Sequence, residues 1–203
     1  LGPSAGVLVV PGTFNVTMHK RVDGEMTELG QSQSFNVVSI RPTPTLPGST
    51  QEQRVIFASQ VDELRRAADG TTSAIDEIVA ELDAVKTTLE RSLTDGSLYE
   101  LANSIQQRLK VQRDRLGSNA TRDSFKDLDE VSVDQRLWHA GFVPTTNAYG
   151  PTDAQRDSLQ IARAQYDSVV AELTTLVETD YAGLKEAMDT ARVPWTPGRG
   201  IQR

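Results

Sequence analysis

The chain has 203 residues, of which 37% are hydrophobic but only 5% aromatic, a composition that suits helices packed through Leu, Val, Ile and Ala better than a sandwich or barrel core. It contains no cysteine, which excludes disulfides, zinc–thiolate sites and a cysteine nucleophile. The net charge of −7 and the absence of a long Lys/Arg run argue against a nucleic-acid partner, and no apolar run approaches the roughly 20 residues that a membrane-spanning helix needs.

The N-terminal 41 residues carry a β pattern. An apolar edge and a Pro-Gly turn precede an alternating strand, and one face of this strand carries Phe14, Val16 and Met18. An Asp-Gly pair then predicts a hairpin turn over residues 22–25, and a second strand is expected over residues 33–40, with Phe35 and Val37 alternating inward. Two or three strands are marginal alone. We therefore expect residues 1–41 to be the terminal strands of an immunoglobulin-like sandwich whose other strands precede residue 1; the alternative is a hairpin that packs on the helices.

Three prolines in six residues predict an extended linker over residues 42–48. A helical region is then expected over residues 49–193. Its first helix begins at Ser49 or Thr50, with Glu52 and Gln53 as capping-box partners. The apolar positions of this helix are spaced alternately by four and three: Phe57, Val61, Leu64, Ala68, Ile75, Ile78, Leu82, Val85 and Leu89.

The segment around Gly70 resembles a stop signal, but the heptad phase survives across it, with Thr71 at the next inward position. A loop has no reason to keep that phase, so the sequence predicts one continuous helix of about 44 residues. Gly70 weakens such a helix by about 1 kcal/mol without ending it.

The remaining helices are separated by polar segments. A second helix is expected from Ser97 to Leu116, with Gly117 as its stop and with inward residues Leu98, Leu101, Ile105 and Leu109. Residues 118–129 are polar and predict a loop, and residues 131–141 predict a short helix that returns along the first one.

The last helix begins with Thr152 as N-cap and Gln155 as its box partner, after a second loop that ends at Pro151. Its seam runs through Leu159, Ala162, Tyr166, Val169, Leu173 and Leu176. The register shifts by one at Val177, and the seam continues through Tyr181, Leu184, Met188 and Ala191. Pro194 closes the helix, and residues 194–203 form a tail. The predicted fold class is therefore mainly α: an antiparallel three-helix bundle with a split middle leg, preceded by a small β-hairpin.

Three segments resemble a known family. Residues 9–16 (Val-Val-Pro-Gly-Thr-Phe-Asn-Val) resemble the strand that ends the immunoglobulin-like domain of secreted, sortilin-like propeller proteins with BNR (Asp-box) repeats, often labelled glycosyl hydrolases. Residues 151–156 (Pro-Thr-Asp-Ala-Gln-Arg) and 193–199 (Val-Pro-Trp-Thr-Pro-Gly-Arg) are similar to that family's helix start and C-terminal ending. The resemblance implies a parent with an N-terminal β-propeller, for which export is usual. The Asp-box repeats and any propeller active site would lie upstream, so no catalytic, cofactor-binding or metal-ligating residue is carried over.

The search for chemistry in the sequence gives few candidates. His19 and His139 have no partner at metal-ligand spacing, and a surface or capping role is expected for both. An acidic cluster lacks the glycine turn and regular spacing of a calcium loop and is expected to be solvated; its members are Asp127, Asp129, Glu130 and Asp134. Trp195 is expected to anchor the tail on the bundle rather than to stack on a sugar.

Pairs of acids occur on the helices, as at Asp62/Glu63 and Asp76/Glu77. A glycosidase needs two converging carboxylates, one of them in an apolar pocket that raises its pKa. These pairs lie opposite the apolar seam, so we expect solvated helix faces instead.

The sequence therefore favours a non-catalytic accessory or assembly module at the C-terminus of a secreted or periplasmic propeller protein, acting as a spacer or docking to a protein partner, with no cofactor. One alternative is a part of a glycoside hydrolase whose active site lies in the propeller. Another is a free-standing helical adaptor that binds its partner in a groove.

Overall fold

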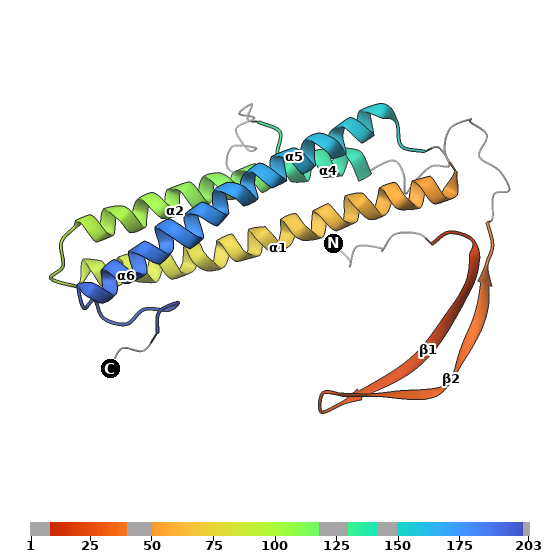
Figure 1. Ribbon diagram of the computed structural model, residues 1–203, viewed down its shortest axis with the longest axis horizontal. Coiled ribbons are helices and arrows are strands. Elements are labelled where there is room, and N and C mark those ends of the chain that lie inside the picture. The colour runs from red at the N-terminus through yellow and green to blue at the C-terminus, as the bar shows by residue number, and fades with distance from the viewer. Residues whose placement is uncertain (1–8, 40–49, 118–129, 142–149, 201–203) are drawn as a thin grey trace.

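A computed structural model describes residues 9–39, 50–117, 130–141 and 150–200, and Figure 1 shows its two parts. A two-stranded antiparallel hairpin comes first, and an elongated antiparallel bundle of helices follows. The predicted fold class is confirmed at this level. The predicted linker at 42–48 and the polar loop at 118–129 lie outside the described residues.

The hairpin consists of β1 (Gly12–Val22) and β2 (Glu25–Val37). Asp23 and Gly24 form the turn with φ values of 50° and 89°, the left-handed pair that a type I′ hairpin turn requires. The expected second strand was too short at its start: β2 begins directly after the turn, since residues 25–29 pair with residues 18–22 although they lack an apolar alternation. It also ends earlier than expected, because Val38 and Ser39 lie beyond it.

The first leg of the bundle is α1 (Gln51–Glu90), a single helix of 40 residues and about 60 Å. Thr50 is its N-cap: the Thr50 side chain accepts from the backbone N–H of Gln53, and the Gln53 side chain accepts from the N–H of Thr50. The helix continues through Gly70, as the heptad phase predicted, and Thr71 donates to the carbonyl of Ala67 and contacts the Tyr166 hydroxyl of the opposite leg.

The second leg is divided between α2 (Ser97–Leu116) and α4 (Val133–Gly141). α4 begins two residues later than expected, because Ser132 and Gln135 form a capping box before it, and it packs against α1 and α5. The inward face of α2 differs from the expected one: Leu101 is 40% exposed, and Ala102 is buried in its place. The face of α2 that contains Ala102 also buries Gln106, Gln112 and Leu116.

The third leg consists of α5 (Asp153–Thr175), the π-helix η1 (Leu176–Tyr181) and α6 (Ala182–Thr190). The predicted one-residue register shift is accommodated by this π-helical turn, which carries one extra residue and brings Tyr181 back to the buried face after Leu176. The expected seam position Ala191 is wrong: α6 ends at Thr190, Ala191 is exposed, and Val193 is the next buried residue.

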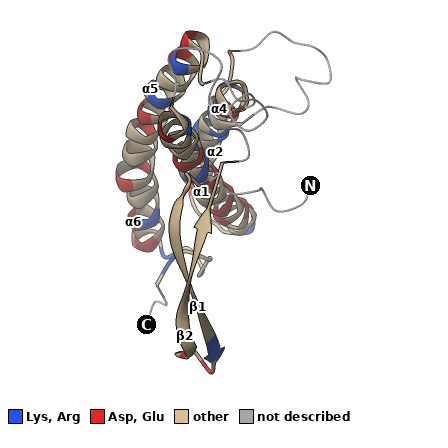
Figure 2. Ribbon diagram, turned by 90° about the vertical axis from the view of Figure 1, so that its right-hand side faces the viewer, with Lys and Arg blue, Asp and Glu red and all other residues tan. Residues whose placement is uncertain are grey.

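The core of the bundle lies along the seam between the three legs. Apart from Ile78 and Thr71, which are half-buried, the predicted inward residues of α1 are buried. Each buried Val, Leu, Ile or Phe side chain contributes about 2 kcal/mol through the area that it removes from water. Acidic and basic residues are interspersed along the helices of the bundle (Figure 2). None of the described helices is both long enough and apolar enough to cross a bilayer.

Candidate interaction surface

The hairpin presents an apolar face. The cross-strand pairs Phe14–Phe35 and Met18–Leu29 lie on the same face as Val16, with an irregularity between them. We call this set the apolar row: Phe14, Val16, Met18, Leu29, Phe35 and Val37. The rings of Phe14 and Phe35 stack with centroids 6.0 Å apart. Side chains along the row remain in solvent, since Val16 is 55%, Met18 67% and Phe35 50% exposed.

The opposite face of the same segment is polar. Thr13 Oγ1 donates to Asn36 Oδ1 at 2.8 Å, and Ser34 Oγ donates to Asn15 Oδ1. These are cross-strand neighbours in the register, so the polar side chains of this face satisfy one another along the ladder. The hairpin is thus amphipathic: one face suits water, and the other suits a packed core.

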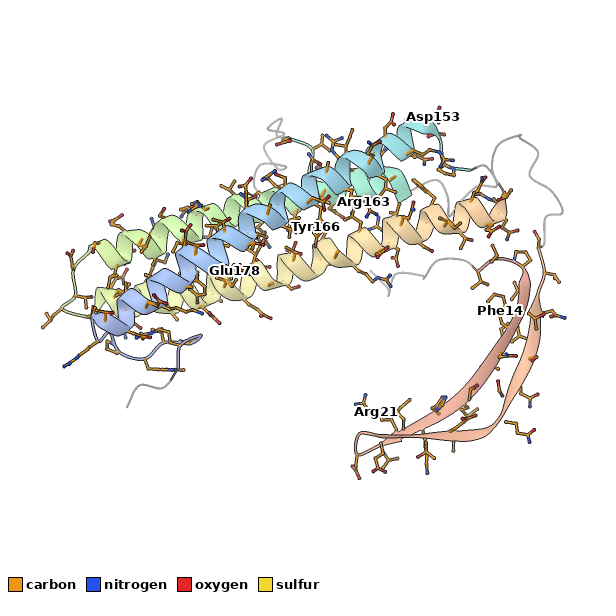
Figure 3. All side chains as sticks on the ribbon, viewed as in Figure 1. Phe14, Arg21, Asp153, Arg163, Tyr166 and Glu178 are labelled. Atoms are coloured by element: carbon orange, nitrogen blue, oxygen red, sulfur yellow. The ribbon has the colours of Figure 1, made fainter. Side chains whose placement is uncertain are left out.

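Nothing among the described residues covers the apolar row. Each strand of the hairpin contacts the other strand and no helix, and Figure 3 shows the hairpin side chains standing apart from those of the bundle. An isolated two-stranded sheet is marginally stable in water. The alternative that the hairpin packs on the helices is therefore not the arrangement in this structure.

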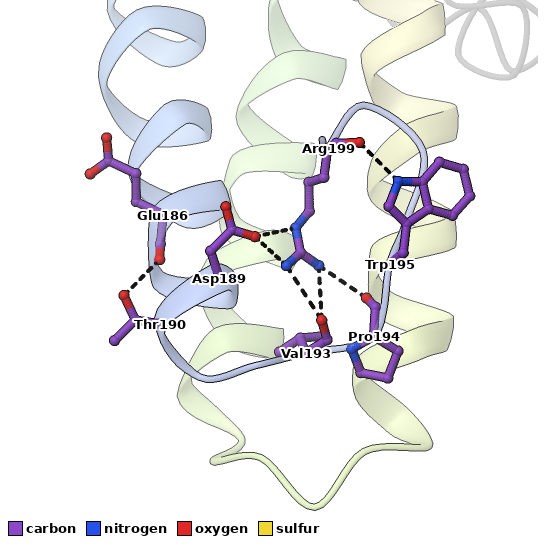
Figure 4. A network of polar contacts seen from close by, with 7 residues as sticks. All are labelled: Glu186, Asp189, Thr190, Val193, Pro194, Trp195 and Arg199. Atoms are coloured by element: carbon purple, nitrogen blue, oxygen red, sulfur yellow. Dashed lines mark hydrogen bonds and ion pairs between the residues drawn. The ribbon is translucent and has the colours of Figure 1, made fainter. Parts of the chain in front are cut away.

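The bundle, by contrast, closes on itself through its C-terminal tail. Arg199 belongs to the tail, and its side chain is only 2% exposed. Its guanidinium forms an ion pair with Asp189 at the end of α6 (Figure 4). The same group donates to the carbonyls of Val193 and Pro194, at 3.3 and 3.0 Å from Nη1. One buried cation therefore satisfies the backbone of the turn that ends the third leg.

This arrangement corrects the expected role of Trp195. Its ring is not the buried anchor of the tail, because Trp195 is 58% exposed and its Nε1 donates within the tail to the Arg199 carbonyl at 2.9 Å. Among the described residues after α6, the buried ones are Val193, Thr196 and Arg199.

A polar contact also joins the third leg to α1. The Tyr181 hydroxyl donates to the Glu81 carboxylate, and burial, followed by that hydrogen bond, raises the pKa of Tyr181. The Lys185 ammonium lies 4.0 Å from the centre of the Tyr181 ring. Gly198, at φ +78°, passes so close to Glu81 that a Cβ there would overlap the carboxylate.

Polar side chains also join α1 and α2 in a way the sequence did not suggest. Gln106 is fully buried, and its amide donates to Asp83 Oδ1 at 2.8 Å and to the carbonyl of Val79, while it accepts from the Lys86 ammonium at 2.6 Å. The Gln106 hydrogen bond, with Lys86 as a further cause, lowers the pKa of Asp83. A glutamine on a seam carries no sequence signal of its own, because its partners lie on another helix.

The predicted chemical candidates do not converge. His19 lies on β1 and His139 on α4, and both are exposed, as expected for surface residues. Asp62 pairs with Arg66 one turn along α1, and Asp76 pairs with Arg113 of α2 at 2.6 Å. Asp127 and Asp129 lie outside the described residues, Asp134 is exposed, and Glu130 accepts from Gln165. Within the described parts of the chain no group of three or more acidic or histidine side chains is arranged to hold a metal ion.

Comparisons with family models, with curated proteins and with solved structures give no match to this chain.

Proposed function

We propose that this chain is a non-catalytic assembly module in which the hairpin docks into a β-sheet of a protein partner and the bundle serves as a rigid spacer. The observation that carries the proposal is the contrast between the two parts: the bundle buries its seam and fastens its own end, whereas the hairpin leaves its apolar row in water. An exposed apolar row on so small a sheet marks a surface that another layer covers.

In this proposal the partner is the immunoglobulin-like sandwich of the parent protein that the resemblance implies. The motifs at 9–16, 151–156 and 193–199 support a secreted, propeller-containing parent whose immunoglobulin-like sandwich takes the hairpin as its terminal strands. The bundle, with α1 spanning about 60 Å, would then project from that sandwich as a spacer.

Hydrogen exchange on the purified chain at low concentration tests the docking role, with light scattering to confirm that it is monomeric. We expect residues 13–18 and 33–37 to exchange quickly, because no covering layer slows the opening of the strands, while the seam of α1 exchanges slowly. Adding the upstream part of the parent is expected to slow exchange in the hairpin and to leave the bundle unchanged. Slow exchange across the hairpin in the monomer would contradict the proposal, since the hairpin would then need no partner.

The non-catalytic part of the proposal has its own test. The acid pairs on α1 lie on its outer face or pair with arginines, so we expect the purified chain not to hydrolyse an aryl glycoside. Hydrolysis that a single Asp or Glu substitution abolishes would contradict it.

A further inference from the structure

We infer that the partner joins the hairpin along the outer edge of β1, over residues 12–18, and that β2 becomes the edge strand of the completed sheet. The inference rests on the proposed docking role and adds the edge, the segment and the chemistry of the partner strand. It is argued from the difference in regularity between the two strands and from the positions of their charged residues.

The two edges differ in regularity. Between the pairs Val16–Gln33 and Met18–Leu29, three residues of β2 stand opposite the single residue Thr17 of β1. Gly30 lies in this irregularity with φ +75°, and Ser32 Oγ donates to the Val16 carbonyl at 3.4 Å. Bulges of this kind interrupt the row of outward N–H and C=O groups and are common on edge strands, where they end pairing. β1 contains no such interruption over its 11 residues.

The charged residues occupy only one half of the hairpin along its length, the half near the turn. Residues 12–18 and 31–37 contain no charged side chain, whereas the part near the turn contains Lys20, Arg21, Asp23, Glu25 and Glu28. Figure 2 shows the charges confined to the end of the hairpin at the turn. Strands that face water at an edge are normally protected by charged side chains. The end near the turn has this protection and the other half does not, which places the partner on the uncharged half.

The partner strand is accordingly extended, uncharged over about seven residues, and alternating. Its apolar side chains continue the apolar row, and its hydroxyl or amide side chains continue the polar ladder of Thr13, Asn15, Ser34 and Asn36. A neutral segment with a free backbone edge selects a neutral strand, because a charged one would lose its hydration without gaining an ion pair.

A second copy of this chain cannot cover both the edge of β1 and the apolar row over a sufficient area. Two hairpins packed face to face would cover about 360 Å² each, from a sheet about 10 Å wide and about 36 Å long. This is less than half of the about 800 Å² per partner typical of stable complexes. Pairing of two copies edge to edge would instead leave both apolar rows in water. A partner that supplies a strand and a second layer covers both the edge and the row.

The test is an NMR titration of the full chain with an acetylated, amidated heptapeptide of alternating threonine and valine. Shifts and slowed amide exchange are expected at the outward amides of residues 12–18, and not at those of β2. The same peptide with every amide N-methylated keeps the side chains but lacks donors on both edges, and it is expected to give no shifts. Perturbation of the β2 edge would overturn the assignment of the edge while leaving the docking role standing.

Two cross-strand neighbours supply a matched pair of variants, since Val16 and Gln33 face each other and are both exposed. Val16→Lys is expected to weaken peptide binding about fivefold, the upper end of what one cross-strand neighbour contributes, and Gln33→Lys to change it little. Equal effects of the two variants would overturn the inference. Shifts in residues 12–18 that appear on concentrating the chain without peptide would show a second copy as the occupant and overturn the choice of partner.

Discussion

Arg199 shows how much of the end of the bundle depends on one side chain. Its guanidinium is buried against Asp189 and two backbone carbonyls, so replacing it with alanine removes the hydrogen bonds that it donates to these groups. We expect Arg199→Ala to lower the free energy of unfolding by about 2 kcal/mol, the scale of hydrogen bonds to a charged group. Urea unfolding followed by circular dichroism measures the change. Arg163→Ala, on the exposed face of α5, is the control and is expected to cost less than about 0.5 kcal/mol.

Tyr181 makes the stability of the bundle sensitive to alkali. Burial and the hydrogen bond to Glu81 raise its pKa above the ordinary value of 10.0. Below that pH the tyrosine is neutral in both the folded and the unfolded chain, and the full stability is present. As the pH rises past 10.0, the unfolded chain loses this proton while the folded chain keeps it, so the stability falls until the raised pKa is reached.

We therefore expect Tyr181→Phe to be less stable than the natural chain near neutral pH, because it loses the Glu81 hydrogen bond, and the gap to narrow above about pH 10. Unfolding free energies from about pH 8 to about pH 11 measure this gap. A gap that stays constant over that range would show that Tyr181 ionises alike in both states.

At the scale of elements, the third leg owes its shape to one additional residue. Its seam advances by three or four residues everywhere except from Leu176 to Tyr181, where the step is five and the helix takes a π-turn. Removing one exposed residue from this turn should leave a regular α-helix with both halves of the seam in phase. Glu178, labelled in Figure 3, is such a residue.

Deletion of Glu178 is thus expected to change the free energy of unfolding by less than about 1 kcal/mol. Deletion of Asp167, which is also exposed but lies within the regular helix α5, rotates the preceding and following seams relative to each other by about 100°. It would expose residues such as Val169 and Leu173 at about 2–5 kcal/mol each. Thermal unfolding of the two deletions checks the prediction, and equal destabilisation would show that the π-turn is required.

The elements also show which features of the fold were predictable. Continuity of α1, the capping boxes at Thr50 and Thr152 and the register shift near Val177 depend on residues close in sequence, and the structure confirms them. Which face of α2 points inward depends on where α1 lies. The heptad pattern of α2 alone therefore predicted Leu101 as an inward residue, whereas Ala102 is buried instead. The first half of β2 is a strand because β1 pairs with it, and its own sequence gives no alternation to indicate this.

The same distinction applies to the candidate interaction surface. The alternation of apolar residues in both strands predicted one apolar face shared by Phe14, Val16, Phe35 and Val37, and the pairing and stacking of Phe14 with Phe35 confirm it. The bulge at Gly30 and the anchoring by Arg199 could not be predicted, because each is defined by contacts between segments rather than by a local pattern.

For the whole molecule, the hairpin and the bundle differ in what stabilises them. Removing the hairpin should therefore not lower the stability of the bundle. Neither strand contacts a helix, so none of the packing that holds the described part of the bundle depends on the hairpin. We expect a chain lacking residues 1–39 to unfold at the same temperature, within about 2 °C, as the full chain. Differential scanning calorimetry of both chains makes the comparison. A chain that ends at residue 192 is the matched control: it loses the tail with Val193 and Arg199, and its midpoint should fall by several degrees. A comparable fall on removal of residues 1–39 would mean that the hairpin stabilises the bundle directly, and its apolar row would then have a partner within its own chain.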